Sequence, residues 1–189
     1  MEIILATESP RKVKIMGTLG LPFKTIPANY PEETIEEKNP LKLVETLALE
    51  KARTLAKKYP QSLVIGADTV MLIDGKITGK PKDLADARAT ILRSSGKIIE
   101  DATGIAVVYK GRERSAAMIG KVTLRKYTEK EVDDYIKETN PLDKAGGFAA
   151  DSTEGGRFLL SYVGEPGQEL GLPKTTLIKF LKEFGVGVS

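Results

Sequence analysis

The stretch IILATESPRKVKIM, residues 3–16, joins a strand pattern to a helix pattern. Its first four residues are an apolar run typical of a short buried strand, and later apolar residues recur at helical spacing. Ser9 and the proline after it are residue types favoured at a helix N-cap and at the first helical position. Arg11 and Lys12 then place two cations in the first turn, where the helix dipole favours negative charge. The stretch therefore predicts a strand–loop–helix unit whose helix start suits a bound anion.

The rest of the chain continues this alternation of strand and helix patterns. Strands are expected at residues 23–27, at 62–68, in a hairpin over 69–81, in two long strands over 101–127 and at 156–164. Helices are expected at residues 40–58, capped by Asn39, at 83–94, at 128–138 with a capping box between Thr128 and Glu131, and from residue 173 onward. The pattern predicts one α/β domain over residues 1–189, with helices on both sides of a mixed, twisted sheet and two lobes around a cleft.

Composition limits the chemistry that the chain can perform. Its 189 residues include no cysteine and no histidine, with 41% apolar and 29% charged residues and a net charge of +3. A disulfide framework, a thiolate nucleophile and a histidine base are therefore excluded. Carboxylates, amines, guanidinium groups and hydroxyls remain, and a hard cation such as Mg²⁺ suits that set. The sequence has neither a membrane-length apolar run nor a signal-peptide pattern, so we expect a cytoplasmic protein.

A carboxylate follows the most strand-like run, in VIGADTV at residues 64–70. If this strand and the first one run parallel, Asp68 lies at the same sheet edge as the loop of Ser9. A carboxylate that faces two cations and a phosphate site is typical of metal-assisted phosphoryl chemistry. In the structural alternative, Asp68 caps a turn or bonds to Thr69. The two cations of the first helix would then extend into solvent or pair with acids such as Glu32 and Glu33.

Two further lysines and one loop are candidate site elements. Lys80 lies in GKPKD, residues 79–83, where a rigid turn holds an ammonium, although an ordinary turn before a helix has the same pattern. Lys51 lies next to the apolar stripe of its helix and either projects into a cleft or extends to water. The loop at 143–156 is rich in glycine and aspartate and carries Phe148; it either shapes a pocket for a base or sugar or only connects elements.

Taken in order, these motifs resemble the Maf family of nucleoside triphosphate pyrophosphatases over nearly the whole chain. The family's Ser-x-Ser-Pro-Arg-Arg stands here as TESPRK, with Thr7 and Lys12 replacing two members. The other matching motifs are LALEKA, which carries Lys51, GADT at 66–69, GKP at 79–81, DKAGGFAADS at 143–152 and VGEPGQELGLP at 163–173.

The resemblance implies a fold like that of inosine triphosphatases and hydrolysis of a nucleoside triphosphate to a monophosphate and pyrophosphate, with Mg²⁺ or Mn²⁺. Asp68 would act as general base or orient the water, and would hold the metal with Glu32 or Glu33. The substrate's phosphates would be bound by Ser9, Arg11, Lys12, Lys51 and Lys80. A homodimer is compatible with the resemblance.

The substrate base stays open at this stage. The family's common loop carries Gln, associated with dTTP and UTP, where this chain has Asp151, and another branch with a wider substrate range carries Glu. A pyrimidine or modified nucleotide is favoured.

Three alternative functions have weaker support: an inosine triphosphate pyrophosphatase, which needs Asn and Lys in the first motif; a nucleotide-binding regulator of septum formation without turnover; and a nucleic-acid-binding protein. Scattered charges and 6% aromatic residues disfavour the last of these.

Overall fold

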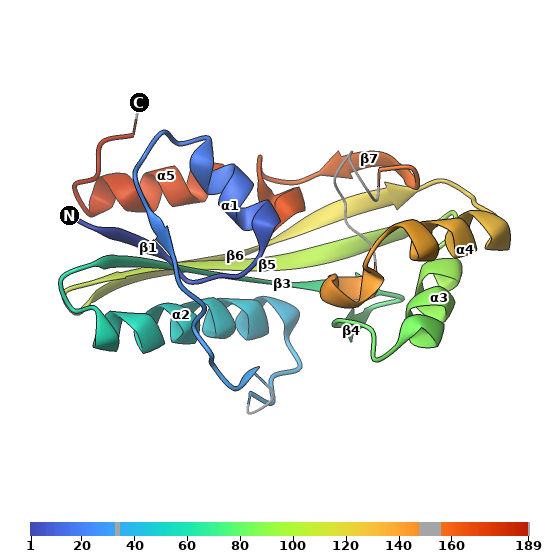
Figure 1. Ribbon diagram of the computed structural model, residues 1–189, viewed down its shortest axis with the longest axis horizontal. Helices are drawn as coiled ribbons and strands as arrows, with labels where there is room; N and C mark the ends of the chain where they lie inside the picture. Colours follow the sequence, from blue (N-terminus) through green and yellow to red (C-terminus); the bar gives the residue numbers. More distant parts are fainter. Residues whose placement is uncertain (33–34, 148–155, 189) are drawn as a thin grey trace. The chain divides into compact units, whose positions relative to one another are not determined.

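The computed structural model describes residues 1–32, 35–147 and 156–188 (Figure 1). Within them the strands form one hydrogen-bonded sheet in the order β2-β1-β3-β5-β6-β7, with β4 paired to β3. Its strands are β1 (Ile3–Leu5), β2 (Lys24–Thr25), β3 (Leu63–Ile73), β4 (Lys76–Thr78), β5 (Ile98–Tyr109), β6 (Arg112–Leu124) and β7 (Leu159–Val163). Strand β1 pairs in parallel with β2 and β3, whereas β4 and β7 pair antiparallel with β3 and β6. The predicted mixed sheet is confirmed.

The helices begin and end close to the predicted residues. They are α1 (Pro10–Gly17), α2 (Pro40–Lys58), α3 (Leu84–Arg93), α4 (Glu129–Glu138) and α5 (Lys174–Glu183), with 3-10 turns η2 (Pro141–Asp143), η3 (Ala145–Gly147) and η4 (Gln168–Leu170). Asn39 caps α2 by accepting from the main-chain N–H groups of Leu41 and Lys42, and Thr128 forms the predicted capping box with Glu131. In the described residues, no helix combines the length and apolar character that a membrane crossing requires.

Strand β3 differs from its prediction. It runs without interruption from Leu63 to Ile73, so Asp68 lies inside the strand and does not follow its end. The strand continues because apolar residues beyond Asp68 are buried and because Met71 and Ile73 pair with β4 across an antiparallel ladder. Two other strands differ in length, since β2 has only two residues and β5 already begins at Ile98.

The chain divides into two compact units. Unit 1 comprises Met1–Thr69, Thr103–Met118 and Glu165–Ser189, and unit 2 comprises Val70–Ala102 and Ile119–Gly164. Their number agrees with the two predicted lobes, and the cleft stays a prediction.

In unit 1, helices cover both faces of the sheet: α1 and α5 lie on one face and α2 on the other (Figure 1). Successive residues of β1 therefore enter different cores. Ile3 and Leu5 pack with apolar residues of α1 and α5, whereas Ile4 packs with those of α2. A strand that is buried on both faces explains why the residues of β1 are continuously apolar.

Unit 2 has its own core, beneath α3 and α4. Phe158 is fully buried there and packs on two tyrosines, with ring centroids 4.3 Å from Tyr127 and 5.3 Å from Tyr135. The Tyr127 hydroxyl donates to the carbonyl oxygen of Ile91 at 2.5 Å, which joins α3 to this cluster. Burial raises the pKa of Tyr127, so the hydroxyl keeps its proton.

Candidate active site

The approach of α2 to the sheet positions the candidate site. Gly66 of β3 faces this helix, and a Cβ atom there would lie 3.1 Å from the main-chain carbonyl carbon of Ala48 and from the main-chain nitrogen of Ala52. Only glycine lets the helix backbone come this close to the strand. Lys51, between those two alanines, is therefore held directly over the strand, and Asp68 follows Gly66 on the same face of β3. The glycine of the GADT motif thus sets the distance between lysine and carboxylate.

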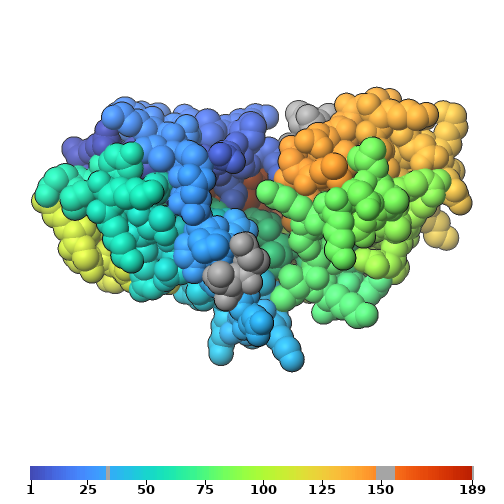
Figure 2. Space-filling view, turned by 60° about the horizontal axis from the view of Figure 1, so that its bottom comes forward, coloured from blue at the N-terminus to red at the C-terminus, as the bar shows by residue number. Residues whose placement is uncertain are grey.

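Lys51 joins two carboxylates. Its ammonium donates to Asp68 Oδ1 and pairs with Glu32 Oε1 at 2.8 Å. The Lys51 and Asp68 side chains are 13% and 12% exposed, whereas that of Glu32 is 53% exposed. Burial by itself would lower the pKa of Lys51, but the charge and hydrogen bond of Asp68, helped by Glu32, raise it above its ordinary value. Figure 2 shows the segment that leads to Glu32 (blue) at the surface beside α2 (teal).

Lys12 reaches the same part of β3 from α1. Its ammonium donates to the main-chain oxygen of Ala67 at 2.6 Å, one residue before Asp68. Burial lowers the pKa of Lys12 to about 8, and the neighbouring charges of Lys51 and Arg11 act in the same direction, against the attraction of Asp68. The predicted alternative, in which Lys12 pairs with Glu32, is not the contact that forms, because Glu32 bonds Lys51 instead.

Helix α1 begins as predicted, except that the hydroxyl oxygen of its N-cap serine does not cap it. Ser9 occupies the N-cap with φ −75° and ψ 115°, and Pro10 is the first helical residue. Within the described chain, however, the Ser9 hydroxyl makes no capping hydrogen bond, and its main-chain N–H donates to Thr7 Oγ1 at 3.0 Å. A helix start that its own side chain leaves uncapped offers N–H donors to an oxyanion. Arg11, half-buried in the first turn, adds positive charge there.

Two hydroxyl groups close to these residues were not predicted as site residues. Thr69 Oγ1 lies 3.0 Å from Thr103 Oγ1, which joins β3 to the fully buried Thr103 of β5. The sequence offers only a weak signal for this contact, namely a threonine within the otherwise apolar run ATGIAVV at 102–108. The contact fixes the backbone immediately after Asp68.

The other predicted site residues either belong to unit 2 or lie outside the described residues. Lys80 belongs to unit 2, where it lies exposed on the turn between β4 and α3. This turn is held by a hydrogen bond of 2.9 Å from the Gly146 N–H to the Gly79 oxygen. Glu33, Phe148 and Asp151 lie outside the described residues, and their roles stay predictions.

The acidic residues meet only part of the metal prediction. Among residues 1–32, 35–147 and 156–188, no group of three or more Asp or Glu side chains gathers as ligands for a metal ion. Two of the three predicted ligands, Glu32 and Asp68, nevertheless meet at one cation, the ammonium of Lys51. Carboxylate oxygens are the donors that Mg²⁺ and Mn²⁺ prefer, so this pair fits such an ion.

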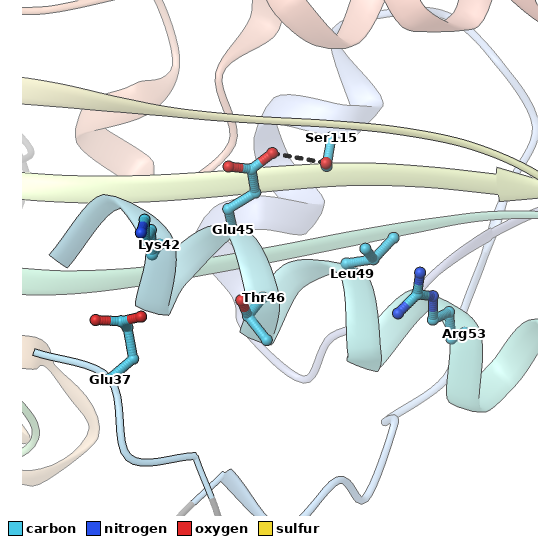
Figure 3. Close-up of a pocket in the computed structure, with 7 residues that line it drawn as sticks. All are labelled: Glu37, Lys42, Glu45, Thr46, Leu49, Arg53 and Ser115. Carbon is cyan, nitrogen blue, oxygen red and sulfur yellow. Dashed lines mark hydrogen bonds between the residues drawn. The ribbon is translucent and has the colours of Figure 1, made fainter. Parts of the chain in front are cut away.

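A separate pocket of about 300 Å³ lies beside α2 (Figure 3). Glu37, Lys42, Glu45, Thr46, Leu49 and Arg53 line it from α2 and the segment before it, and Ser115 lines it from β6. Ser115 donates to Glu45 at 2.7 Å, and Arg53 bonds both carboxylate oxygens of Glu113. Two of its charged groups, Glu45 and Arg53, thus already have partners, and none of the predicted site residues that the structure describes lines it.

The fold and the cluster around Asp68 define an α/β protein with cations and carboxylates gathered on one central strand. Residues 2–184 match the family described as Maf-like protein. The chain belongs to this family, which confirms the predicted resemblance.

Individual relatives are similar over their whole length. A dTTP/UTP pyrophosphatase of Dictyoglomus turgidum is 34% identical over 187 residues, or 97% of this chain and 96% of that protein. One of Bacillus cytotoxicus is 35% identical over 188 residues, or 100% and 98%. Among solved structures, a HAM1 protein of Coxiella burnetii has a TM-score of 0.53 at 15% identity, with 97% of this chain and 98% of that chain covered. This last likeness concerns the fold alone, and it agrees with the predicted fold class.

Proposed function

We propose that this chain is a nucleoside triphosphate pyrophosphatase that cleaves the bond between the α- and β-phosphates of a pyrimidine nucleotide. Membership of the Maf-like family and relatives named dTTP/UTP pyrophosphatase support the reaction and the substrate class. The structural observation that carries the proposal is the cluster on β3, where Asp68 meets Lys51 while Lys12 binds the preceding residue. The alternative of a regulator that binds nucleotides without turnover is not favoured by these relatives.

Asp68 is the proposed general base. In a chain without histidine, a carboxylate is the available group that can accept the proton of an attacking water. The water oxygen attacks the α-phosphorus, the bond to the bridging oxygen breaks, and pyrophosphate leaves with that oxygen. The bond from Lys51 fixes the orientation of the Asp68 carboxylate, which keeps it aimed at one position.

Cations would bind the phosphate chain. Ser9, Arg11 and Lys12 lie at the start of α1, where the main-chain N–H groups and both side chains favour phosphate oxygens. Lys51 and Lys80 would offset the negative charge that develops on the transferred and departing groups. In this proposal Asp151 contributes to base selection.

Glu32 and Asp68 would hold the divalent cation, with Glu33 as the further predicted ligand. When bound, Mg²⁺ or Mn²⁺ supplies positive charge to the phosphates and makes a coordinated water more acidic. The chain's own residues supply the base and the phosphate-binding cations. A cytoplasmic location, a homodimer and the absence of nucleic-acid binding also stay part of the proposal.

Pyrophosphate release tests the proposal directly. The purified chain is incubated with Mg²⁺ or Mn²⁺ and each standard nucleoside triphosphate, and we expect pyrophosphate and monophosphate from dTTP and UTP. Asp68→Asn should abolish release but retain binding of a dTTP analogue with a methylene between its α- and β-phosphates. Asp74→Asn, at an exposed carboxylate paired with Lys97, should keep full activity. Turnover by Asp68→Asn at the wild-type rate would refute the assigned base.

A further inference from the structure

The segment from Glu165 to Pro173 forms a tightly bonded loop against α1. Its 3-10 turn η4 contacts α1, and Gly167 and Gly171 on either side of it have φ of 85° and 82°. The Gly171 N–H donates to the Gln168 oxygen at 2.7 Å, and the Leu172 N–H donates to the Gly167 oxygen at 3.0 Å. The buried Gln168 side chain also accepts from the Glu165 N–H at 3.0 Å. These bonds give the loop a fixed shape.

Gly171 is the point at which this loop meets the candidate site. A Cβ atom there would lie 3.0 Å from Lys12 Cε and 3.1 Å from Thr69 Oγ1, tighter than ordinary van der Waals contact. The Lys12 stem has little room to move away, because its ammonium is bonded to the Ala67 oxygen at 2.6 Å. Gly171 is itself buried. The Lys12 side chain is thus held between Gly171, which lies against its stem, and β3, which accepts the hydrogen bond of its ammonium.

We propose that Gly171 is a positioning residue for Lys12: it supports the lysine stem and keeps the ammonium directed at the phosphate-binding position beside β3. The inference rests on the proposed function, in which Lys12 binds the phosphate chain. An ammonium has three N–H donors, so a lysine that gives one to Ala67 has others for phosphate oxygens. Lysine has high rotamer entropy in solution, and a stem that is already fixed loses less of it when substrate binds.

Two matched glycine variants separate this role from backbone strain. Gly171→Ala and Gly185→Ala introduce the same change at φ of 82° and 79°, and a Cβ atom at Gly185 would meet nothing within 4 Å. We expect Gly171→Ala to weaken binding of inorganic tripolyphosphate, and to raise KM for dTTP, by about tenfold, as when a charge-assisted hydrogen bond is weakened. The value of kcat should change little. Gly185→Ala should lose thermal stability through backbone strain alone and should bind tripolyphosphate as the wild type does.

A double-mutant cycle shows whether the effect passes through Lys12. In a Lys12→Ala background the stem is gone, so Gly171→Ala should cause no further loss of tripolyphosphate affinity. An equal loss with and without Lys12, or no loss in either, overturns the proposal. If Gly171→Ala alone does not fold, folding of the double variant supports the contact, and failure of the double variant overturns it. If the cycle shows this coupling but the wild-type chain releases no pyrophosphate, the proposed hydrolysis is refuted and the positioning role of Gly171 still holds.

Discussion

Replacing Lys51 by methionine keeps most of the apolar stem but removes the ammonium shared by Asp68 and Glu32. The two carboxylates then differ sharply in their surroundings. Glu32, whose side chain is 53% exposed, can turn to water, whereas Asp68, at 12%, is left as a buried charge without its cation. The stability of the substrate-free protein should therefore depend on Lys51 mainly through Asp68.

The expected cost follows from that burial. Removing one partner of a buried ion pair costs about 3 kcal/mol or more, because the other charge stays desolvated. For a chain of 189 residues this corresponds to a fall in Tm of about 6 to 12 °C. Neutralising the second partner as well, in Lys51→Met with Asp68→Asn, should restore about 2 kcal/mol of the loss, the coupling expected of directly bonded charges.

Urea denaturation at neutral pH measures the four members of this cycle. Arg53→Met, two residues further along α2, is the matched control: Arg53 is 39% exposed and pairs with Glu50 and Glu113, so its loss should cost about 1 kcal/mol or less. A loss below about 1 kcal/mol for Lys51→Met, or simple additivity in the double variant, would contradict the reasoning.

Further predictions concern Lys12, the two glycines Gly66 and Gly17, and Glu131. Burial lowers the pKa of Lys12 to about 8, so tripolyphosphate affinity should fall above that pH as its charge is lost, and calorimetry should show a flatter profile for Lys12→Arg. Gly66→Ala should cost about 3 kcal/mol or more in urea denaturation, because its Cβ would meet the backbone of α2. Gly17→Ala, with open space around it at the end of α1, should instead stabilise by about 0.5 kcal/mol. The pKa of Glu131 is lowered to about 2, chiefly by its hydrogen bond with Arg125, so its stabilising contribution is present above the ordinary pKa and lost toward pH 2. Glu131→Gln should accordingly lower Tm at neutral pH and have little effect near that acid limit.

Features that depend on a few neighbouring residues could be predicted from the sequence. The Thr128–Glu131 capping box and the Asn39 cap each lie within one helical turn, and both form as expected. Apolar residues on both faces predicted the buried part of β3 that leads to Asp68. These signals are local, so the structures they predict do not depend on contacts with distant parts of the chain.

Contacts between residues that are far apart in the sequence could be predicted only in part. The motifs selected Lys51 and Asp68, but not their direct bond, because that bond depends on how closely α2 approaches Gly66. Lys12 was expected to bind phosphate or, in the structural alternative, to face acids or solvent; its bond to a main-chain oxygen is a contact that no side-chain pattern reveals. The prediction ended β3 too early because a charged residue usually marks a strand end, whereas here Asp68 is satisfied inside the sheet by Lys51.

The core on the α1 and α5 side of unit 1 combines residues that are far apart in the sequence. Leu177 and Leu181 of α5 pack with Ile3, Leu5 and Leu63. Helix α5 follows every other described element along the chain, so during synthesis on a ribosome the first strands emerge long before their cover. Until α5 emerges, a nascent chain displays part of that apolar face to its surroundings, the condition in which chaperones bind and chains aggregate. The strands that are translated first are therefore the ones whose apolar face stays exposed for the longest time.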